Sequence, residues 1–182
     1  MNFARMFHTA SVLIDRRVLV RGGHADTSLR SSDLFNPSPR LWTVASAMST
    51  ARHLHTATVL TNGDVLVVGG NSNGVFLNTA ELYNSSTGNW TFTGNTSIVR
   101  NSHIEAILTN GKVLVTGGHN DVYLNSTELY DPLTGLWKST GNMNYARRHH
   151  TAWLLTNRKV LSTGGFNGFD LNITELYDPS IV

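Results

Sequence analysis

The residues with the most evident chemical potential lie in two copies of the pattern Gly-Gly-His-x-Asp. The copies contribute His24 with Asp26 and His119 with Asp121. Two imidazoles and two carboxylates form a donor set that suits Zn²⁺ or Cu²⁺. The four side chains meet only if the two segments face each other, as in a closed ring of four units. Loop polarity accounts for the same residues more simply, so we expect no metal or other cofactor, and the metal site is an alternative.

A second pattern, Arg-x-x-His, suggests an anion site or a ring of metal ligands. It occurs four times, as Arg5/His8, Arg52/His55, Arg100/His103 and Arg147/His150. Each pair recurs at a regular interval, as a structural residue does, and structural ion pairs imitate functional clusters. We therefore predict that the arginine packs over an aromatic ring or pairs with a carboxylate, and that the histidine caps a strand.

The spacing of these motifs reveals an internal repeat. Gly-Gly pairs occur at 22–23, 69–70, 117–118 and 164–165, separated by 47, 48 and 47 residues. An acidic-Leu-aromatic triplet follows each pair, and a tryptophan follows the first three triplets, at Trp42, Trp90 and Trp137. Such a period indicates one supersecondary unit copied four times. We place the repeats at approximately 5–51, 52–99, 100–146 and 147–182, within a single domain spanning 1–182.

The pattern of a complete repeat predicts four short strands. In the second repeat, apolar runs at 55–60 and 65–68 flank Asn62-Gly63, a dipeptide that favours a tight β-hairpin. The Gly-Gly pair ends the second strand, a third strand runs through 79–83, and a fourth begins at Trp90. No apolar 3.6-residue period lasts long enough to indicate a helix. The fold class is therefore all-β, built from four-stranded antiparallel units.

A recurring four-stranded unit of ~50 residues is typical of a β-propeller blade. The Gly-Gly pair, the tyrosine and the tryptophan seven residues later (Tyr83/Trp90, Tyr130/Trp137) resemble the kelch-repeat family. The run His-Thr-Ala…Asn-Gly-Lys-Val-Leu-Val-Thr-Gly-Gly resembles the kelch subgroup related to the galactose-oxidase propeller. The resemblance covers essentially the whole chain. It implies a kelch-type propeller in which tyrosine and tryptophan fill the space between blades.

The last repeat stops at 177–182, before its tryptophan-bearing strand, and the N-terminal residues offer no spare strand. We therefore expect the last blade to lack its fourth strand and the chain to be part of a larger propeller. The alternative is a closed four-bladed ring. Open terminal blades would favour self-association.

Recognition residues are expected where the repeats differ most, in the loops after each second strand. In an antiparallel blade these loops emerge at the same end as the connection after strand four. The candidate ligand-binding residues are His24, Asp26, Arg30, Asn71, Asn73, Phe76, His119, Asp121, Tyr123, Phe166, Asn167, Phe169 and Asp170. Drift in solvated loops is the alternative interpretation. We predict a non-catalytic module that binds a protein or a glycan through this face.

Glu105 is a further departure between repeats, because alanine stands at the equivalent positions 10, 57 and 152. The kelch resemblance implies that this position lines the central channel. We expect a hydrated channel carboxylate, with ligand contact as the alternative; a buried carboxylate would need a partner.

The chain shows no recognisable catalytic motif, and we predict that it is not an enzyme. Galactose-oxidase chemistry, as the resemblance implies it, needs a tyrosine cross-linked to cysteine, and the chain has no cysteine. Gly-x-Ser-x-Gly, His-Glu-x-x-His and phosphate-binding loops are also missing from the sequence. A carboxylate pair for glycoside hydrolysis is not recognisable from the sequence, because its two residues have no fixed spacing along the chain. The propeller portion of a galactose-oxidase-like or other carbohydrate-active enzyme is therefore the alternative.

Composition limits the class of partner. The 182 residues are 40% hydrophobic and 14% charged, with a net charge of +2. Lysine and arginine scatter through all repeats, which argues against nucleic acid. The short apolar runs argue against membrane insertion. Five glycosylation sequons, at Asn84, Asn89, Asn95, Asn125 and Asn172, weakly favour an extracellular protein, although residues 1–5 show no signal-peptide core.

Overall fold

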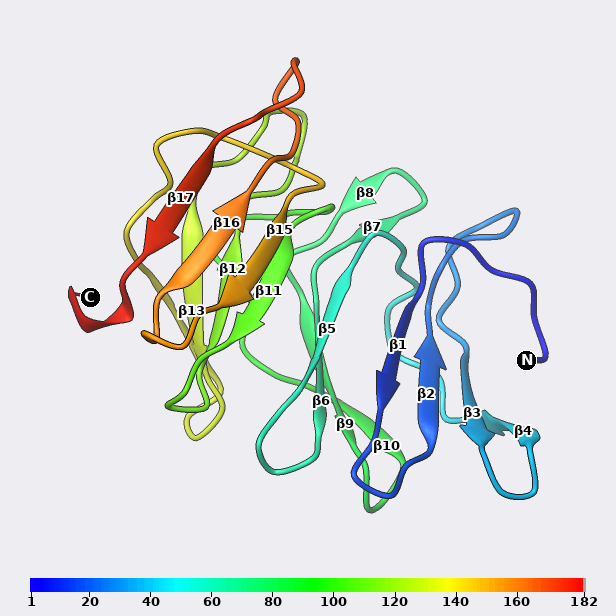
Figure 1. Cartoon of the computed structure of the whole chain (residues 1–182). Coiled ribbons are helices and arrows are strands. Elements are labelled where there is room, and N and C mark those ends of the chain that lie inside the picture. The colour runs from blue at the N-terminus through cyan, green and yellow to red at the C-terminus, as the bar shows by residue number, and fades with distance from the viewer. Residues whose placement is uncertain (182) are drawn as a thin grey trace.

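A computed structural model describes residues 1–181, and its strands form four antiparallel blades (Figure 1). Blade 1 comprises β1 (Thr9–Val12), β2 (Val18–Arg21), β3 (Ser32–Asn36) and β4 (Leu41–Ala45). Blade 2 comprises β5 (Thr56–Val59), β6 (Val65–Val68), β9 (Ala80–Asn84) and β10 (Asn89–Phe92), with a small hairpin of β7 (Asn71–Ser72) and β8 (Val75–Phe76). Blade 3 comprises β11 (Ile104–Ile107), β12 (Val113–Thr116), β13 (Thr127–Asp131) and β14 (Leu136–Ser139). Blade 4 comprises β15 (Thr151–Leu154), β16 (Val160–Thr163) and β17 (Thr174–Tyr177), followed by a 3-10 turn at Pro179–Ile181. The all-β prediction is confirmed.

The turn between the first two strands has the same geometry in every blade. Gly63 and Gly111 adopt φ angles of 85° and 79°, as the Asn-Gly signal predicts. In blades 1 and 4, Arg16 and Arg158 take the same left-handed conformation, with φ of 69° and 67°. The amide of each of these four residues donates to a leucine carbonyl three residues earlier. All four blades therefore adopt this turn, including blades 1 and 4, in which arginine stands in place of glycine.

The apolar core lies between blades rather than within them. At the first joint, Leu13 and Leu19 of blade 1 pack with Val65, Tyr83 and Trp90 of blade 2. The joints between blades 2 and 3 and between blades 3 and 4 are built from equivalent residues. The sheets of blades 2 and 3 thus bury both faces against their neighbours. The prediction that tyrosine and tryptophan fill the space between blades is confirmed.

The blades form an open arc, and the alternative of a closed four-bladed ring is wrong. The innermost strands lie side by side in the order β1, β5, β11, β15 (Figure 1). Within residues 1–181, β1 pairs with β2 and not with a strand of blade 4, so the four sheets stay separate. The segment before β1 lies along blade 1, where Asn2 and Arg5 bond to Asp33. The last blade has three strands in the described residues, as expected.

Among the described residues, none of the helical structure is long and apolar enough to cross a bilayer.

Candidate functional site

The Arg-x-x-His arginines are part of the scaffold. Arg52 donates from Nη1 to the carbonyl oxygens of Gly69 and Thr79, and from Nη2 to the Glu81 carboxylate at 2.8 Å. Both charged side chains of this pair are fully buried. The other repeats make the same pair, as Arg5–Asp33, Arg100–Glu128 and Arg147–Glu175, at 2.6–3.0 Å. The predicted pairing with the triplet carboxylate is confirmed.

The same carboxylates also hold the connections that enter each blade. Glu81 accepts hydrogen bonds from the backbone amides of Ser49 and Thr50. Glu128 and Glu175 each accept hydrogen bonds from two backbone amides of the next two connections in the same way. A carboxylate that accepts an arginine and two amides has three of its roughly four acceptor sites occupied. We therefore assign the triplet acids a structural role.

Three of the four motif histidines join neighbouring blades, which corrects the prediction that each caps its own strand. His55 Nε2 lies 2.9 Å from Thr9 Oγ1 of blade 1, and His103 Nε2 lies 2.7 Å from Thr56 Oγ1 of blade 2. His150 bonds instead to Thr116 at 2.8 Å. Burial lowers the pKa of His55 and His103 well below the ordinary value, which favours neutral rings. The rings are inter-blade contacts, not a ring of metal ligands.

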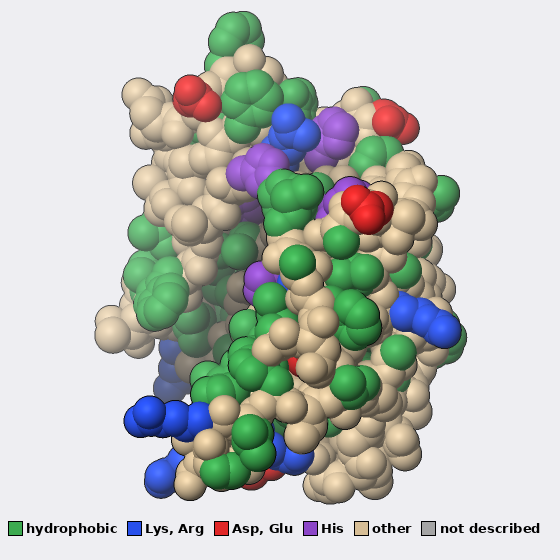
Figure 2. All heavy atoms as spheres, turned by 90° about the vertical axis from the view of Figure 1, so that its right-hand side faces the viewer, with side chains coloured by type: hydrophobic (Ala, Val, Ile, Leu, Met, Phe, Trp, Pro, Cys, Tyr) green, Lys and Arg blue, Asp and Glu red, His purple; other side chains and the backbone are tan. Residues whose placement is uncertain are grey.

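The strand-two loops and the inter-blade connections meet at one end of the molecule, as strand parity predicted. Isolated bridges join the two in every repeat, for example Met6 with His24 and Arg148 with Phe166. This end, which we call the loop face, is at the top of Figure 1 beside the β7–β8 hairpin. Figure 2 shows histidines gathered at the same end around a basic side chain.

An aromatic row crosses the loop face from blade 2 to blade 4. Phe76 lies 5.9 Å from His119 between ring centroids, and His119 lies 5.3 Å from Tyr123. Tyr123 continues the row to Phe166 at 5.7 Å. The Arg148 guanidinium lies 5.5 Å from the Tyr123 centroid and 5.4 Å from that of Phe166, within the range of a cation–π contact. The structure thus brings four sequence candidates into one continuous surface.

Several residues of this face were missed by sequence reasoning. Arg148 belongs to the row, and His53 packs against His24 at 4.9 Å and against Phe7 at 6.3 Å. These residues occupy the two x positions of Arg-x-x-His, a motif in which only the arginine and the histidine were assigned a role from the sequence. The signal was present in the sequence, because these positions differ in every repeat (Met-Phe, His-Leu, Asn-Ser, Arg-His) within an otherwise fixed motif.

The loop tips carry exposed apolar residues. Val75, Val122 and Phe169 stand at equivalent tips of blades 2, 3 and 4, and Phe169 is 81% exposed. Asp26, Arg30, Asp121 and Asp170 are also exposed on these loops, while Asn167 is half-buried. The tips therefore add an apolar edge to the aromatic row.

Two of the candidate residues, Asn71 and Asn73, form hydrogen bonds within and between the loops. Asn71 is buried and its Oδ1 accepts the amide of Gly74. Asn73 Oδ1 accepts the amide of Ser28 at 2.7 Å, which ties the blade 2 loop to the blade 1 loop. Asn71 therefore shapes the face from within, whereas Asn73 is exposed and also joins two loops of the face.

The His-x-Asp loops do not assemble a metal site in residues 1–181. His24 lies with His53 on blades 1 and 2, whereas His119 lies in the aromatic row with Phe76 and Tyr123. No group of three or more His, Cys, Asp or Glu side chains in the described chain is arranged to hold a metal ion. The metal alternative required a closed ring, and the arc is open.

Glu105 is half-buried on β11, the innermost strand of blade 3, and its side chain reaches across to blade 2; its place in a central channel stays a prediction. Thr58 Oγ1 donates to Glu105 Oε2 at 2.6 Å, while Oε1 is shut off from solvent and has no hydrogen-bond partner among residues 1–181. Burial raises the pKa of Glu105 to about 7, although hydrogen bonds from Thr58 and Thr56 and the charge of Arg21 act in the opposite direction. Burial likewise lowers the pKa of Arg21 to about 9.

Two hollows of about 340 Å³ open beside the Glu105 side chain. One is lined by Thr9, His55 and His103, and the other by Ala152 and Trp153. The Glu105 carboxyl therefore lies beside both hollows, between the inner strands of blades 2 and 3, and Thr58 is its hydrogen-bond donor.

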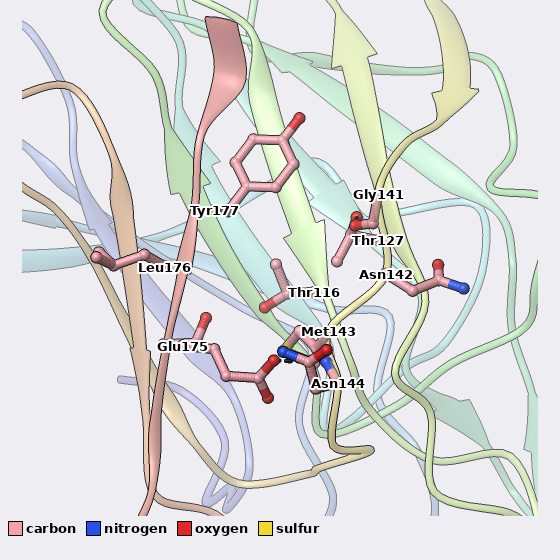
Figure 3. Close-up of a pocket in the computed structure, with 10 residues that line it drawn as sticks. Thr116, Thr127, Gly141, Asn142, Met143, Asn144, Glu175, Leu176 and Tyr177 are labelled. Carbon is pink, nitrogen blue, oxygen red and sulfur yellow. Dashed lines mark hydrogen bonds between the residues drawn. The ribbon is translucent and has the colours of Figure 1, made fainter. Parts of the chain in front are cut away.

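A smaller pocket of about 80 Å³ lies between blades 3 and 4 (Figure 3). Figure 3 shows the Glu175 carboxylate directed at Asn144, and it also accepts from the Tyr145 amide and Arg147. The volume corresponds to a few water molecules. Because its carboxylate is already bonded, we assign this pocket to the scaffold.

The sequon asparagines are spread over three blades. Asn89, Asn95 and Asn172 are exposed. Asn84 is half-buried and accepts from the Thr87 amide and hydroxyl, and Asn125 donates to the Met143 carbonyl. The exposed three are the more accessible acceptors, and glycosylation stays a prediction.

A family model described as the KLHDC2/KLHL20/DRC7 Kelch-repeats domain matches residues 2–165. The chain belongs to the kelch-repeat family. Kelch-repeat domains are in general non-catalytic protein-interaction modules. No curated protein matches this kelch chain. Its assignment to the galactose-oxidase-like subgroup stays a prediction.

Proposed function

We propose that this kelch chain is a non-catalytic module that binds a protein partner on its loop face. The observation that supports this most is the aromatic row from Phe76 to Phe166, with Arg148 placed over two of its rings. Tyrosine and arginine are enriched among the residues that carry most of the binding energy in protein interfaces. The repeats keep their joint residues and vary these ones, as expected when specificity is added to a fixed scaffold.

The electrostatics of the loop face favour an apolar contact with one strong cation. Burial lowers the pKa of His53, His119 and His149, with smaller contributions from His24 or Arg148 nearby. These imidazoles therefore favour the neutral form at pH 7. The guanidinium of Arg148 is then the main charge within the row. A partner that offers apolar side chains to the rings and an acceptor to the guanidinium fits this surface.

The test is site-directed photo-cross-linking in an extract of the source cells. A photoreactive amino acid at Phe169 reports on the loop face, and one at the exposed Leu133, in the β13–β14 turn, is the matched control. We expect a protein adduct from position 169 and not from position 133. Adduct formation from position 133 alone would refute the assignment.

Replacement of Phe76, Tyr123, Phe166 and Phe169 by alanine tests the energetics. We expect affinity for the cross-linked partner to fall at least ~10-fold, since aromatic anchors each contribute over ~1 kcal/mol. A variant with Leu133→Ala and Leu136→Ala, exposed residues outside the loop face, should bind like the parent. Unchanged binding by the fourfold variant, with its folding intact, would exclude the aromatic row as the principal contact.

A further inference from the structure

We propose that Asn167 is a site of spontaneous deamidation, where the loop tip of blade 4 exchanges a neutral amide for a carboxylate without an enzyme. The reacting groups are the side-chain amide of Asn167 and the backbone amide of Gly168. They lie in the β16–β17 loop, which projects from the top of the molecule (Figure 1). The reaction itself is independent of the proposed function, whereas its effect on binding rests on that function.

The reaction is an intramolecular displacement followed by hydrolysis. The Gly168 backbone nitrogen gives its proton to solvent and attacks Cγ of Asn167, so that a C–N bond forms and the side-chain nitrogen leaves as ammonia. The five-membered succinimide ring then adds one water molecule at either carbonyl, and the C–N bond that breaks decides between aspartate and isoaspartate. No oxidant, cofactor or second chain is needed. Glycine favours ring closure, because it has no Cβ to obstruct the approach.

The chain contains four Asn-Gly pairs, at 62–63, 73–74, 110–111 and 167–168. In three of them the glycine amide, which is the nucleophile, is already a hydrogen-bond donor. The Gly63 and Gly111 amides donate to leucine carbonyls at 2.9 Å, and the Gly74 amide donates to Asn71 Oδ1 at 2.7 Å. These amides have to be released before they can attack.

The asparagine side chains of the same three pairs are also held. Asn62 Oδ1 and Asn110 Oδ1 each accept the backbone amide two residues later, at 3.1 Å. Asn73 Oδ1 accepts the Ser28 amide at 2.7 Å. Moving the side chain onto the next backbone nitrogen gives up these bonds as well. Each of the three pairs therefore loses hydrogen bonds on both reacting groups before it reacts.

Asn167 and Gly168 carry neither restraint. Among residues 1–181, the Gly168 amide donates no hydrogen bond and the Asn167 side chain makes none; only the Asn167 backbone amide is bonded, to the Phe169 carbonyl at 3.2 Å. Gly168 is exposed, with a φ of 107°, and no atom lies within 4 Å of the place where its Cβ would stand. The nucleophile and the incoming water are therefore both unobstructed.

The free amide is a property of this kind of loop. In the corresponding loops of blades 1 and 3, the amides of Ala25 and Asn120 donate to the carbonyl two residues later at 3.1 Å, as that of Asn167 does. The next residues, Asp26 and Asp121, are exposed, and their amides donate no hydrogen bond within the described chain. Blades 1 and 3 are each followed by another blade, so a neighbouring blade leaves this tip exposed.

Blade 3 offers a comparison at the same backbone position. Asn120 is followed by Asp121, whose Cβ stands beside the attacking nitrogen. The φ of Asp121 is 78° and that of Gly168 is 107°, so both tips have a left-handed backbone. Asn120 Oδ1 is buried without a hydrogen-bond partner in residues 1–181. We therefore expect Asn120 to react slowly and Asn167 to react fast.

The modification changes the charge of the loop face. Phe166, the last ring of the aromatic row, directly precedes Asn167, and the Arg148 guanidinium lies 5.4 Å from the Phe166 centroid. The exposed Phe169 and Asp170 follow in the same tip. A second carboxylate here competes with the acceptor that the proposed partner offers to Arg148. We therefore expect the modified chain to bind this partner more weakly.

Peptide mapping by mass spectrometry tests the chemistry. The folded parent chain is held at neutral pH, and the conversion of each Asn-Gly pair is followed with time. We expect Asn167 to react at least ~10-fold faster than Asn62, Asn73 or Asn110, because only its pair reacts without first giving up hydrogen bonds. In urea-unfolded chain the four pairs should react at similar rates. Similar rates in the folded chain would overturn the proposal.

Two variants exchange the tips of blades 3 and 4. Gly168→Asp gives blade 4 the pair found in blade 3, and it should slow the reaction at Asn167 several-fold. Asp121→Gly gives blade 3 an Asn-Gly pair, and it should speed the reaction at Asn120 several-fold. Unchanged rates at both positions would show that the tip geometry does not control the reaction and would overturn the proposal.

Asn167→Asp isolates the effect of the product charge on binding. We expect it to bind the cross-linked partner about 2–5-fold more weakly than the parent, as one added charge at the edge of an interface does. Asn62→Asp, in the β5–β6 turn away from the loop face, is the matched control and should bind like the parent. Equal binding by Asn167→Asp would overturn the effect on binding. Failure of the proposed function would appear separately, as the absence of a loop-face adduct with unchanged deamidation rates.

Discussion

At the scale of single residues, Glu105 is the clearest departure from the repeat. Its pKa, raised by burial to about 7 from an ordinary 4.5, means that the folded protein holds the proton more tightly than the unfolded chain. The stability linked to this group is therefore fully present below pH 4.5 and is lost as the pH rises through about 7.

We predict that Glu105→Gln removes this loss. Relative to the variant, the parent chain should lose about 1–3 kcal/mol of unfolding free energy between pH 4.5 and pH 8, since one pKa unit corresponds to ~1.4 kcal/mol. Urea denaturation at pH 4.5, 6 and 8 measures the difference. Parallel profiles for the two proteins would show that Glu105 is not protonated preferentially in the folded state.

The motif histidines act in the opposite direction. Burial lowers the pKa of His150 to about 4, with the charge of Arg147 adding to the effect. Its contribution to stability is therefore present above pH 6.5 and is lost as the pH falls through about 4. We predict that His150→Gln reduces the loss of unfolding free energy over this window by on the order of 2 kcal/mol. Urea denaturation at pH 7 and pH 4.5 tests this, and an unchanged pH profile would contradict it.

At the scale of secondary-structure elements, the first hairpin turn of each blade contains a left-handed residue. Glycine occupies it in blades 2 and 3, whereas Arg16 and Arg158 adopt it in blades 1 and 4. A side chain in this conformation costs roughly 1–2 kcal/mol. We predict that Arg158→Gly raises the unfolding free energy by about 1 kcal/mol and that Gly63→Ala lowers it by a similar amount. Urea denaturation of both variants is the measurement, and equal effects of the same sign would refute the strain argument.

The ion pair between each connection and its blade is the second element-scale feature. The Arg52–Glu81 side chains are both 0% exposed, whereas Glu175 of the equivalent blade 4 pair is 12% exposed. Removing one charge of a buried pair leaves the other uncompensated and costs about 3–5 kcal/mol. We expect Glu81→Gln to approach this range and Glu175→Gln to be milder in thermal or urea unfolding. The reverse order would contradict the burial argument.

At the scale of the whole molecule, the Gly-Gly pairs set how closely blades approach. Gly69 and Gly164 have nearly the same φ, 60° and 64°, but a Cβ on Gly164 would have its nearest neighbour at 3.6 Å rather than 2.5 Å. We predict that Gly69→Ala destabilises the chain by about 1–3 kcal/mol more than Gly164→Ala, because only the first forces two blades apart. Thermal unfolding of monomeric samples measures this, and equal losses would refute it.

The sequence by itself determined the blade, its four strands and the role of Tyr83 and Trp90, and it gave carboxylate pairing as one of two roles for each motif arginine. These features follow from turn chemistry and apolar alternation that are local in the chain, repeated often enough to exclude coincidence. The candidates Phe76, His119, Tyr123 and Phe166 were found in the same way, from the loops that vary between repeats.

The tertiary structure alone decided how the repeats meet. His55 reaches Thr9, Glu105 reaches Thr58, and Arg148 lies over Tyr123, each across a joint between residues 25 to 47 positions apart. Spacing within a repeat does not encode these contacts, because they depend on the rotation and separation of neighbouring sheets. The same holds for the open arc, since closure depends on the sum of the angles between blades, to which each packed joint contributes.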